Sequence, residues 1–161
     1  MSDKQLRVEL AKQQLICLMA GLEVARYSVS SGKNGAGELC NTGCTPRGRH
    51  RVRIKIGAGC PENTVFVGRR PTGECYSESL AKREPQRDWV LSRIIWLTGL
   101  ESGLNRGGRV DTLRRYIYIH GTPDSEPMGV PRSHGCIRMR NRDLIELFDW
   151  VERGSLVEIM A

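Results

Sequence analysis

Cys136 stands in a stretch whose residue types could perform nucleophilic chemistry. The segment "VPRSHGCIRMRN", residues 130–141, places this thiol directly after His134 and Gly135. An imidazole near a cysteine can accept the thiol proton and stabilise the resulting thiolate. The spacing therefore makes Cys136 a candidate nucleophile.

His120 is the candidate base for this thiol. It ends the segment "RRYIYIHG", in which Tyr118 and His120 share one strand face. Because His120 comes from a separate strand, it can approach the sulfur across the intervening loop. His134 is held at a fixed offset by the local backbone, so we expect a supporting role for it. The carbonyl of Gly121 could orient the His120 ring.

The neighbours of Cys136 suggest how a substrate would be held. Gly135 has no Cβ, so the chain can turn sharply and bring the amides of Gly135 and Cys136 close to a developing oxyanion. Arg138 and Arg132 could each grip a substrate carboxylate through their guanidinium donors. We expect Tyr118 and Ser133 to line the same substrate site.

Two other interpretations of the cysteine remain open on the residues alone. A thiol is often an inert core residue, although the polar setting of "SHGC" disfavours burial. A metal site could use His120, His134 and Cys136. Cys40 and Cys44 form a Cys-x3-Cys pair, but no second paired spacing accompanies it, so we expect no metal and no cofactor.

The chain is basic, with a formal net charge of +7 over 161 residues. The densest cluster is "RGRHRVRIKIG", in which Arg51, Arg53 and Lys55 alternate with apolar residues. This period of two is typical of a strand with one solvated and one buried face. It favours a charged strand face over a non-catalytic nucleic-acid or glycan-binding module, which we keep as a remote alternative.

The elements that must position these residues are predicted to be mostly β. The opening segments "QLRVEL", "QQLICLMA" and "EVARYSV" are separated by turn residues and indicate a β-meander. "WVLSRIIWLTG" and "RRYIYIHG" are rich in aromatic and β-branched residues, which favours central strands. One long helix is expected in "NRDLIELFDWVERG", with Asn141 as its cap and Gly154 as its stop. The length favours one domain over residues 1–161.

Two motifs resemble the signature of the L,D-transpeptidase catalytic domain, often called the YkuD-type domain. They are "IHGT" at residues 119–122 and "SHGCIRM" at residues 133–139. The segments "SVSSGK", "CTPRGRHRV", "DWVLSRIIWLTGLESG" and "GSLVEIM" also fall in the family's order, so the resemblance covers nearly the whole chain. It implies a β-sandwich or barrel-like pair of sheets with one late helix.

The same resemblance implies a mechanism. Cys136 would attack the carbonyl between an L-centre and D-alanine in a peptidoglycan stem peptide. His120 would be the base, the Gly121 carbonyl would steady it, and His134, Gly135 and Cys136 would form the oxyanion region. D-Alanine would leave with a proton from His120, and an acceptor would resolve the thioester. Carbapenem-type β-lactams are implied as covalent inhibitors.

The acceptor distinguishes two activities within this family. Family transpeptidases transfer the acyl group to the side-chain amine of a second stem peptide, which makes cross-links outside the membrane. This chain opens "MSDKQLRVEL", without the order of a secretory signal, and has no run of roughly 20 apolar residues. We therefore expect a cytoplasmic L,D-carboxypeptidase that trims soluble muropeptides with water. The alternative is an L,D-transpeptidase, periplasmic if an export signal has been removed.

Overall fold

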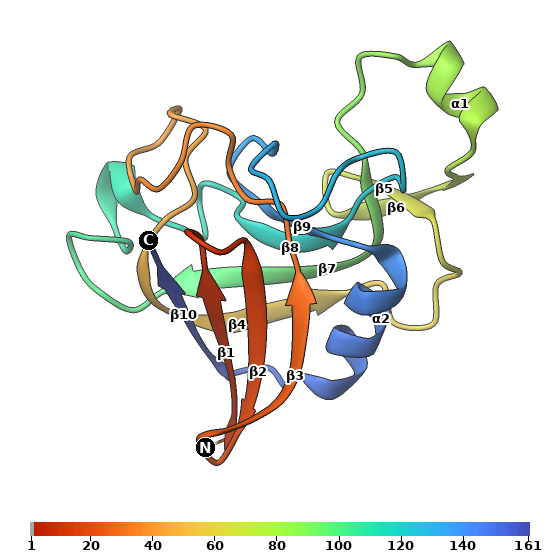
Figure 1. Ribbon diagram of the computed structural model, residues 1–161. Helices are drawn as coiled ribbons and strands as arrows, with labels where there is room; N and C mark the ends of the chain where they lie inside the picture. Colours follow the sequence, from red (N-terminus) through yellow and green to blue (C-terminus); the bar gives the residue numbers. More distant parts are fainter. Residues whose placement is uncertain (1) are drawn as a thin grey trace.

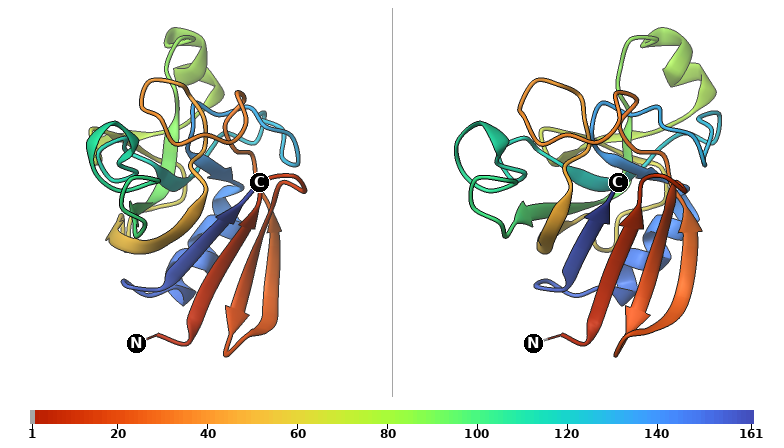
Figure 2. Two further views of the ribbon diagram at one scale, coloured as in Figure 1. Left: turned by 90° about the vertical axis from the view of Figure 1, so that its left-hand side faces the viewer. Right: turned by 60° about the vertical axis from the view of Figure 1, so that its left-hand side comes forward.

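The first part of the sheet is an antiparallel meander, seen in a computed structural model that describes residues 2–161. Its strands are β1 (Lys4–Glu9), β2 (Gln14–Met19) and β3 (Leu22–Ser28). The last strand of the chain, β10 (Leu156–Met160), runs parallel to β1 and antiparallel to β4 (Gly48–Ile56). The views in Figure 2 show β10 beside β1. The predicted meander is therefore confirmed, and β10 connects it to the rest of the sheet.

The second part of the sheet is built on the long strand β7 (Val90–Gly99). β7 pairs antiparallel with β4, with β5 (Thr64–Val67) and with β8 (Tyr118–Gly121). β6 (Arg70–Cys75) pairs with β5, and the short strand β9 (Ile137–Met139) runs parallel to β8. In Figure 1 the meander stands nearly upright while β4 and β7 run across the view, so the sheet bends around one core.

One aliphatic core lies inside this bend. Leu6 and Val157 come from the meander side, whereas Ile95 and Ile119 come from β7 and β8. The helix α2 (Asn141–Trp150) covers this core and buries Leu144, Leu147 and Phe148 at helical spacing. The mostly β class and the long late helix are both confirmed. A shorter helix that the sequence did not indicate, α1 (Glu78–Arg83), follows its N-cap Ser77.

The predicted ends of α2 were wrong. Asn141 is the first helical residue rather than the cap, and the helix ends at Trp150, before Gly154. The Asn141 side chain is used elsewhere: Oδ1 accepts a hydrogen bond from Ser92 Oγ at 2.7 Å, and Nδ2 donates to the Thr122 carbonyl at 3.0 Å. These bonds tie the start of α2 to β7 and to the end of β8.

The segment "RRYIYIHG" also differs from its prediction as one long strand. β8 begins only at Tyr118, because the preceding residues form a turn in which Tyr116 has a φ of 57°. This turn lets the Trp96 indole donate to the Leu113 carbonyl at 3.1 Å. The strand that positions His120 is therefore short and starts at the residue that contacts Cys136.

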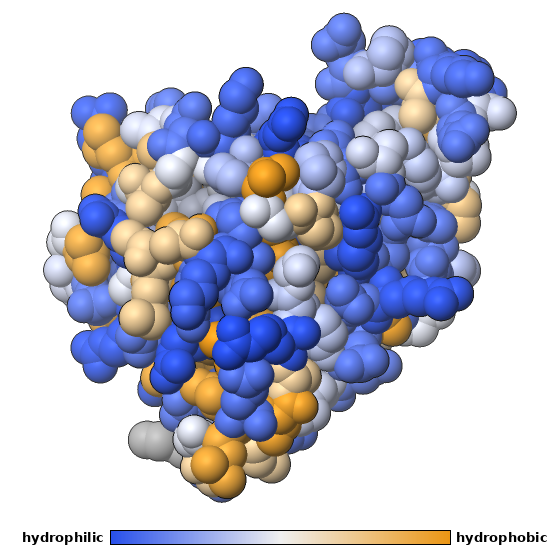
Figure 3. Space-filling view, in the orientation of Figure 1, coloured by the Kyte–Doolittle hydropathy of each residue, from blue (hydrophilic) through white to orange (hydrophobic). Residues whose placement is uncertain are grey.

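The surface is mostly polar, with one group of apolar residues at the bottom of the view in Figure 3 and others scattered along its left side. Met19, Leu22 and Val24 are exposed around the turn from β2 to β3. In β4 the predicted alternation holds only as far as Arg53: Val52 is buried and Arg53 exposed, but Ile54, Lys55 and Ile56 are all half-buried beyond a register shift. Over residues 2–161, no helix has the length and apolar character needed to cross a membrane.

Candidate active site

Cys136 lies at the start of β9, directly beside β8. Ile137 and Ile119 are partners in this parallel pair, so Cys136 lies one step earlier, next to Tyr118. The Tyr118 amide donates to the Cys136 sulfur at 3.3 Å, and the thiol donates to the Tyr116 carbonyl at 3.3 Å. The nucleophile predicted from the sequence is thus half-buried and held by the backbone of β8.

His120 is brought to the same face of the strand pair as Cys136. Side chains two residues apart share a strand face, so Tyr118 and His120 on β8 face the same way as Cys136 and Arg138 on β9. His120 is buried, and its Nδ1 lies 2.6 Å from the Gly121 carbonyl oxygen. The predicted orientation by Gly121 is therefore present, and this bond fixes Nδ1 as the protonated nitrogen.

Gly121 itself is required by close packing. A Cβ at this position would clash with Asn141 Oδ1 and with the Leu91 carbonyl. Because Gly121 is small, β8 can approach β7 and the start of α2. This close approach keeps the Gly121 carbonyl, which accepts the hydrogen bond from His120 Nδ1, in place.

Burial sets the protonation states of both groups. It raises the pKa of the Cys136 thiol to about 12, although the hydrogen bond from Tyr118 opposes this shift. It lowers the pKa of His120, against the opposing effects of the Gly121 carbonyl and of Asp88. At neutral pH the site therefore contains a protonated thiol and a neutral imidazole, which are the reactants of a general-base step.

The turn before Cys136 is held by two hydroxyl groups. Thr45 Oγ1 donates to the Gly135 carbonyl at 2.9 Å, and Ser133 Oγ accepts from the Gly135 amide at 3.1 Å while donating to the Cys136 carbonyl. Gly135 has a φ of 123°, and its missing Cβ leaves room for the carbonyl of Cys44. Ser133 is 2% exposed, so it shapes the turn instead of lining a substrate site as predicted.

These bonds also change one predicted oxyanion donor. The Gly135 amide is already used by Ser133 Oγ. Within the described chain, the amides of His134 and Cys136 make no hydrogen bond. They are therefore the donors that remain for an oxyanion.

Asp88 is a site residue that the sequence did not indicate. One carboxylate oxygen lies 3.2 Å from His134 Nδ1, and the other accepts from Arg138 Nη2 at 2.9 Å. Burial works to raise the pKa of Asp88, but His134, His120 and Arg138 hold it below its usual value. Arg138 is buried and engaged by Asp88, so it is not the free carboxylate grip predicted for it. Arg132 is exposed and remains available.

A second unforeseen residue is Arg69, at the turn between β5 and β6. Its guanidinium lies 4.6 Å from the Tyr116 ring and 5.4 Å from the Trp96 ring. Its Nη1 donates to the Tyr118 hydroxyl at 3.3 Å. Arg69 has no ion-pair partner in residues 2–161. The predicted substrate residue Tyr118 is buried and instead orients this half-buried cation beside the face of Cys136.

Two hollows meet at His134. One of about 320 Å³ is lined by four basic residues and two acidic ones: Lys33, Arg87, Arg132, Arg138, Asp88 and Glu126. The other, of about 430 Å³, is lined by three basic residues and one acidic one: Arg109, Arg114, Arg115 and Asp111. The His134 side chain is 77% exposed and lines both. The surroundings of the site are therefore positively charged.

No cluster of three or more His, Cys, Asp or Glu side chains in residues 2–161 has the arrangement of a metal site. All six cysteines are free thiols. Cys40 and Cys44 lie in the loop that Arg115 anchors: its guanidinium donates to the Cys44 carbonyl at 2.6 Å and to the Glu38 carbonyl at 3.0 Å. This loop thus supports the Gly135 turn through its backbone.

A β fold bent around an aliphatic core, with a Cys–His pair on adjacent strands, defines the class of this protein. The profile of the L,D-transpeptidase catalytic domain (YkuD) matches residues 3–159, and the chain belongs to this family. Candidate L,D-transpeptidases named YkuD from Bacillus licheniformis and Bacillus subtilis are each 44% identical over 46 residues, which is 29% of this chain and 28% of theirs.

Solved structures show the same fold at low sequence identity. An L,D-transpeptidase from Mycobacterium smegmatis has a TM-score of 0.64 at 17% identity, covering 99% of this chain and 59% of that chain. A cysteine-to-serine mutant of the Enterococcus faecium L,D-transpeptidase has a TM-score of 0.60 at 19% identity, covering 99% of this chain and 50% of that chain. This chain thus spans about half to three fifths of the solved relatives.

Proposed function

We propose that this protein modifies peptidoglycan by cysteine-dependent acyl transfer from a stem peptide. The observation that carries the proposal is a protonated Cys136 thiol on the same strand face as a neutral His120 whose Nδ1 donates to the Gly121 carbonyl. His120 Nε2 makes no hydrogen bond within the described residues, so its lone pair is free for a proton. Membership of the L,D-transpeptidase catalytic domain family supports the substrate class.

The reaction begins when the Cys136 thiol transfers its proton to His120 Nε2 and the sulfur attacks the carbonyl that precedes D-alanine. The amides of His134 and Cys136 stabilise the tetrahedral oxyanion. When the C–N bond breaks, Nε2 returns the proton to the amine of D-alanine, and a thioester remains. Water then gives a proton to Nε2 and its hydroxyl group to the acyl carbon. The C–S bond breaks, and Nε2 returns the proton to the sulfur, which restores the thiol and releases the carboxylic acid.

The charge around the site favours water over an amine as acceptor. Basic residues outnumber acidic ones in both hollows that meet at His134. An amine acceptor is a cation at neutral pH and is repelled there, whereas the carboxylates of a stem peptide are attracted. Arg69 and Arg132 are the guanidiniums available for such carboxylates. We therefore assign L,D-carboxypeptidase activity, with L,D-transpeptidase activity as the alternative.

Two partners follow from this assignment. The substrate is a soluble muropeptide tetrapeptide, and the compartment that suits the free thiols is the reducing cytoplasm.

A covalent carbapenem-type inhibitor is the second partner. Solved relatives include an L,D-transpeptidase in complex with imipenem and an avibactam carbamoyl enzyme. Incubation with imipenem followed by intact-mass spectrometry tests whether Cys136 is acylated, with Cys136→Ala as the control.

The assay that tests the function uses purified protein and disaccharide tetrapeptide, with products followed by mass. Free D-alanine and disaccharide tripeptide are the expected products. A cross-linked dimer as the main product would replace the hydrolase with the transpeptidase. Intact tetrapeptide after long incubation with folded protein would contradict both activities. Fractionation of cells for the native protein tests the compartment.

A further inference from the structure

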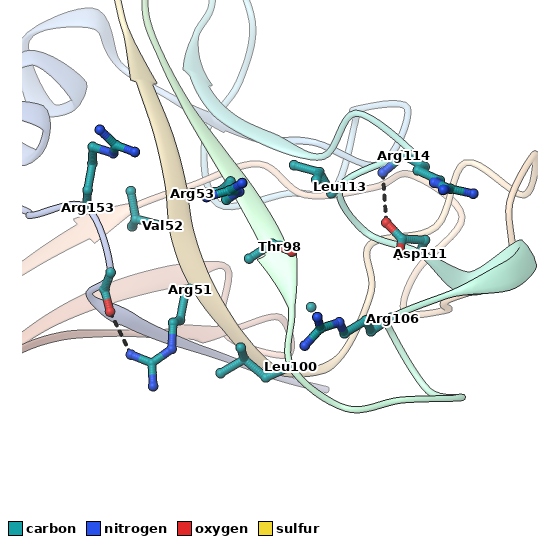
Figure 4. A pocket seen from close by; sticks show the side chains of 12 residues that line it. Arg51, Val52, Arg53, Thr98, Leu100, Arg106, Asp111, Leu113, Arg114 and Arg153 are labelled. Carbon is teal, nitrogen blue, oxygen red and sulfur yellow. Dashed lines mark hydrogen bonds between the residues drawn. The ribbon is translucent and has the colours of Figure 1, made fainter. Parts of the chain in front are cut away.

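An arginine-rich hollow lies apart from Cys136, at the end of β7. It encloses about 680 Å³ between β4, the loop after β7 and the turn between α2 and β10. Its basic residues are Arg51, Arg53, Arg106, Arg114 and Arg153, and its one acidic residue is Asp111. Figure 4 shows Arg51 and Arg153 on one side of Thr98, with Arg106 and Arg114 on the other. Segments far apart in the sequence thus contribute five arginines to the lining of one hollow.

These five charges are not neutralised by the described chain. None of the five arginines takes part in an ion pair within residues 2–161. Arg51 donates to the Gly154 carbonyl at 2.9 Å, but this acceptor carries no net charge. The oxygens of Asp111 are occupied by backbone amides, Oδ2 by Gly107 at 2.7 Å and Oδ1 by Arg114 at 3.0 Å.

Clustering like charges costs free energy through mutual repulsion unless a counter-charge is present. Some arginines elsewhere are paired with carboxylates, such as Arg26 with Glu23, Arg47 with Glu38 and Arg87 with Glu74. The hollow instead gathers five unpaired arginines beside one carboxylate, so an anion from outside the described chain would supply their counter-charge. We propose that it is a binding site for a diphosphate-bearing anion.

The number of guanidiniums indicates the class of ligand. One carboxylate is matched by a single bidentate arginine, whereas a diphosphate offers several oxygens and more than one negative charge to several arginines. The volume lies within the usual range for small-ligand sites, about 300–1,000 Å³. Both a free diphosphate and the diphosphate of a nucleotide-linked molecule have this chemistry.

The position of the hollow connects it to the active site. Asp111 and Arg114 line this hollow and also the one that reaches Tyr116 and His134. A ligand anchored here by its diphosphate would extend along the chain of hollows toward Cys136. The inference does not depend on the proposed reaction, because binding can be measured without turnover.

Calorimetric titration with pyrophosphate and, separately, with UDP tests the site at low salt. We expect both to bind the unmodified protein, more weakly at higher ionic strength because salt screens exposed charges. The triple variant Arg53→Gln, Arg106→Gln, Arg153→Gln should lose affinity by about tenfold or more, since each charge-assisted hydrogen bond contributes separately. Equal affinity for the two probes identifies a free diphosphate, and tighter UDP binding identifies a nucleotide-linked ligand.

A matched control removes the same amount of charge elsewhere. The variant Arg70→Gln, Lys82→Gln, Arg83→Gln changes exposed residues of β6 and α1 that do not line the hollow. It should keep its affinity within about twofold if the effect is local and not one of net charge. Melting temperatures verify that both variants are folded. The proposal is overturned if neither probe binds the unmodified protein, or if both triple variants bind like it.

Discussion

Two thiols, Cys17 in β2 and Cys136 before β9, have similarly raised pKa values in different surroundings. Burial raises the pKa of each to about 12. Cys17 is 2% exposed and packs in the aliphatic core. Cys136 is half-buried, hydrogen-bonded by the backbone of β8, and shares its face with His120. The pKa therefore does not separate the proposed nucleophile, Cys136, from the core thiol of Cys17.

Two buried imidazoles repeat this contrast. Burial lowers the pKa of both His50 and His120. Both ring nitrogens of His50 are used, with Nδ1 3.0 Å from the Gly48 carbonyl oxygen and Nε2 3.0 Å from Thr112 Oγ1. His120 uses Nδ1 alone. The comparison teaches that a functional group differs from a structural one by an atom left free to react.

The largest expected effect comes from removing one thiol or the other. Cys136→Ala should lower turnover of tetrapeptide by about 10⁴-fold or more, because no nucleophile remains. Cys17→Ala should leave turnover unchanged within about twofold, at the cost of a small cavity. Steady-state assays with both variants at matched folded concentration provide the measurement. Substantial activity in Cys136→Ala would remove the distinction between the two thiols.

The next effect separates the two imidazoles. His120→Asn should lower kcat/KM by about 10³-fold, since a general base contributes roughly 10²–10⁴-fold. In the unmodified protein, kcat/KM should persist below the ordinary histidine pKa of about 6.5 and fall only as His120 is protonated, because burial lowers its pKa. A profile of kcat/KM against pH measures this decrease on the acid side. A decrease that begins well above pH 6.5 would point to a different base.

A smaller effect is expected from Arg69. Arg69→Met keeps an apolar side chain over Tyr116 and Trp96 but removes the charge, so KM should rise by about tenfold with kcat nearly unchanged. Arg70→Met, at the adjacent exposed position, is the control and should behave like the unmodified protein. Identical KM values for the two variants would show that Arg69 does not bind a substrate carboxylate.

The smallest effect on turnover comes from His50, whose contribution is to stability. Its pKa is lowered from 6.5 to about 4 by burial, so the unfolded chain binds the proton more tightly. Stability should be complete above about pH 6.5 and decrease by about 3 kcal/mol as the pH falls toward 4. Chemical unfolding across this pH range should show that the unmodified protein loses more free energy of unfolding than His50→Gln does. Parallel curves of unfolding free energy against pH for the two proteins would exclude this contribution of His50.

The sequence predicted those parts of the molecule that depend on local patterns. The meander, β7 and α2 followed from periodic apolar residues, and residue types and the family motif singled out Cys136 and His120, which lie on one face of the β8–β9 pair. Asp88 and Arg69 could not be found in this way. Their partners, His134 and Tyr118, lie far along the chain, and only the folded sheet brings them together.

Local signals also failed where tertiary bonds compete with them. Asn141 has the residue type of a helix cap, but its amide serves Ser92 and Thr122 instead. Tyr116 has strand propensity, yet the chain turns there so that its carbonyl accepts from Cys136. In both cases the exception lies beside the active site, where polar contacts outweigh propensity.

The central position of β10 has a consequence for how this protein is made. β10 comes last in chain order among the described strands, yet it lies between β1 and β4 and is hydrogen-bonded to both. Until residues 156–160 have left the ribosome, the meander and the strands that hold Cys136 and His120 cannot join in one sheet. The completed sheet, and with it the arrangement of Cys136 and His120, can therefore form only after residues 156–160 have left the ribosome.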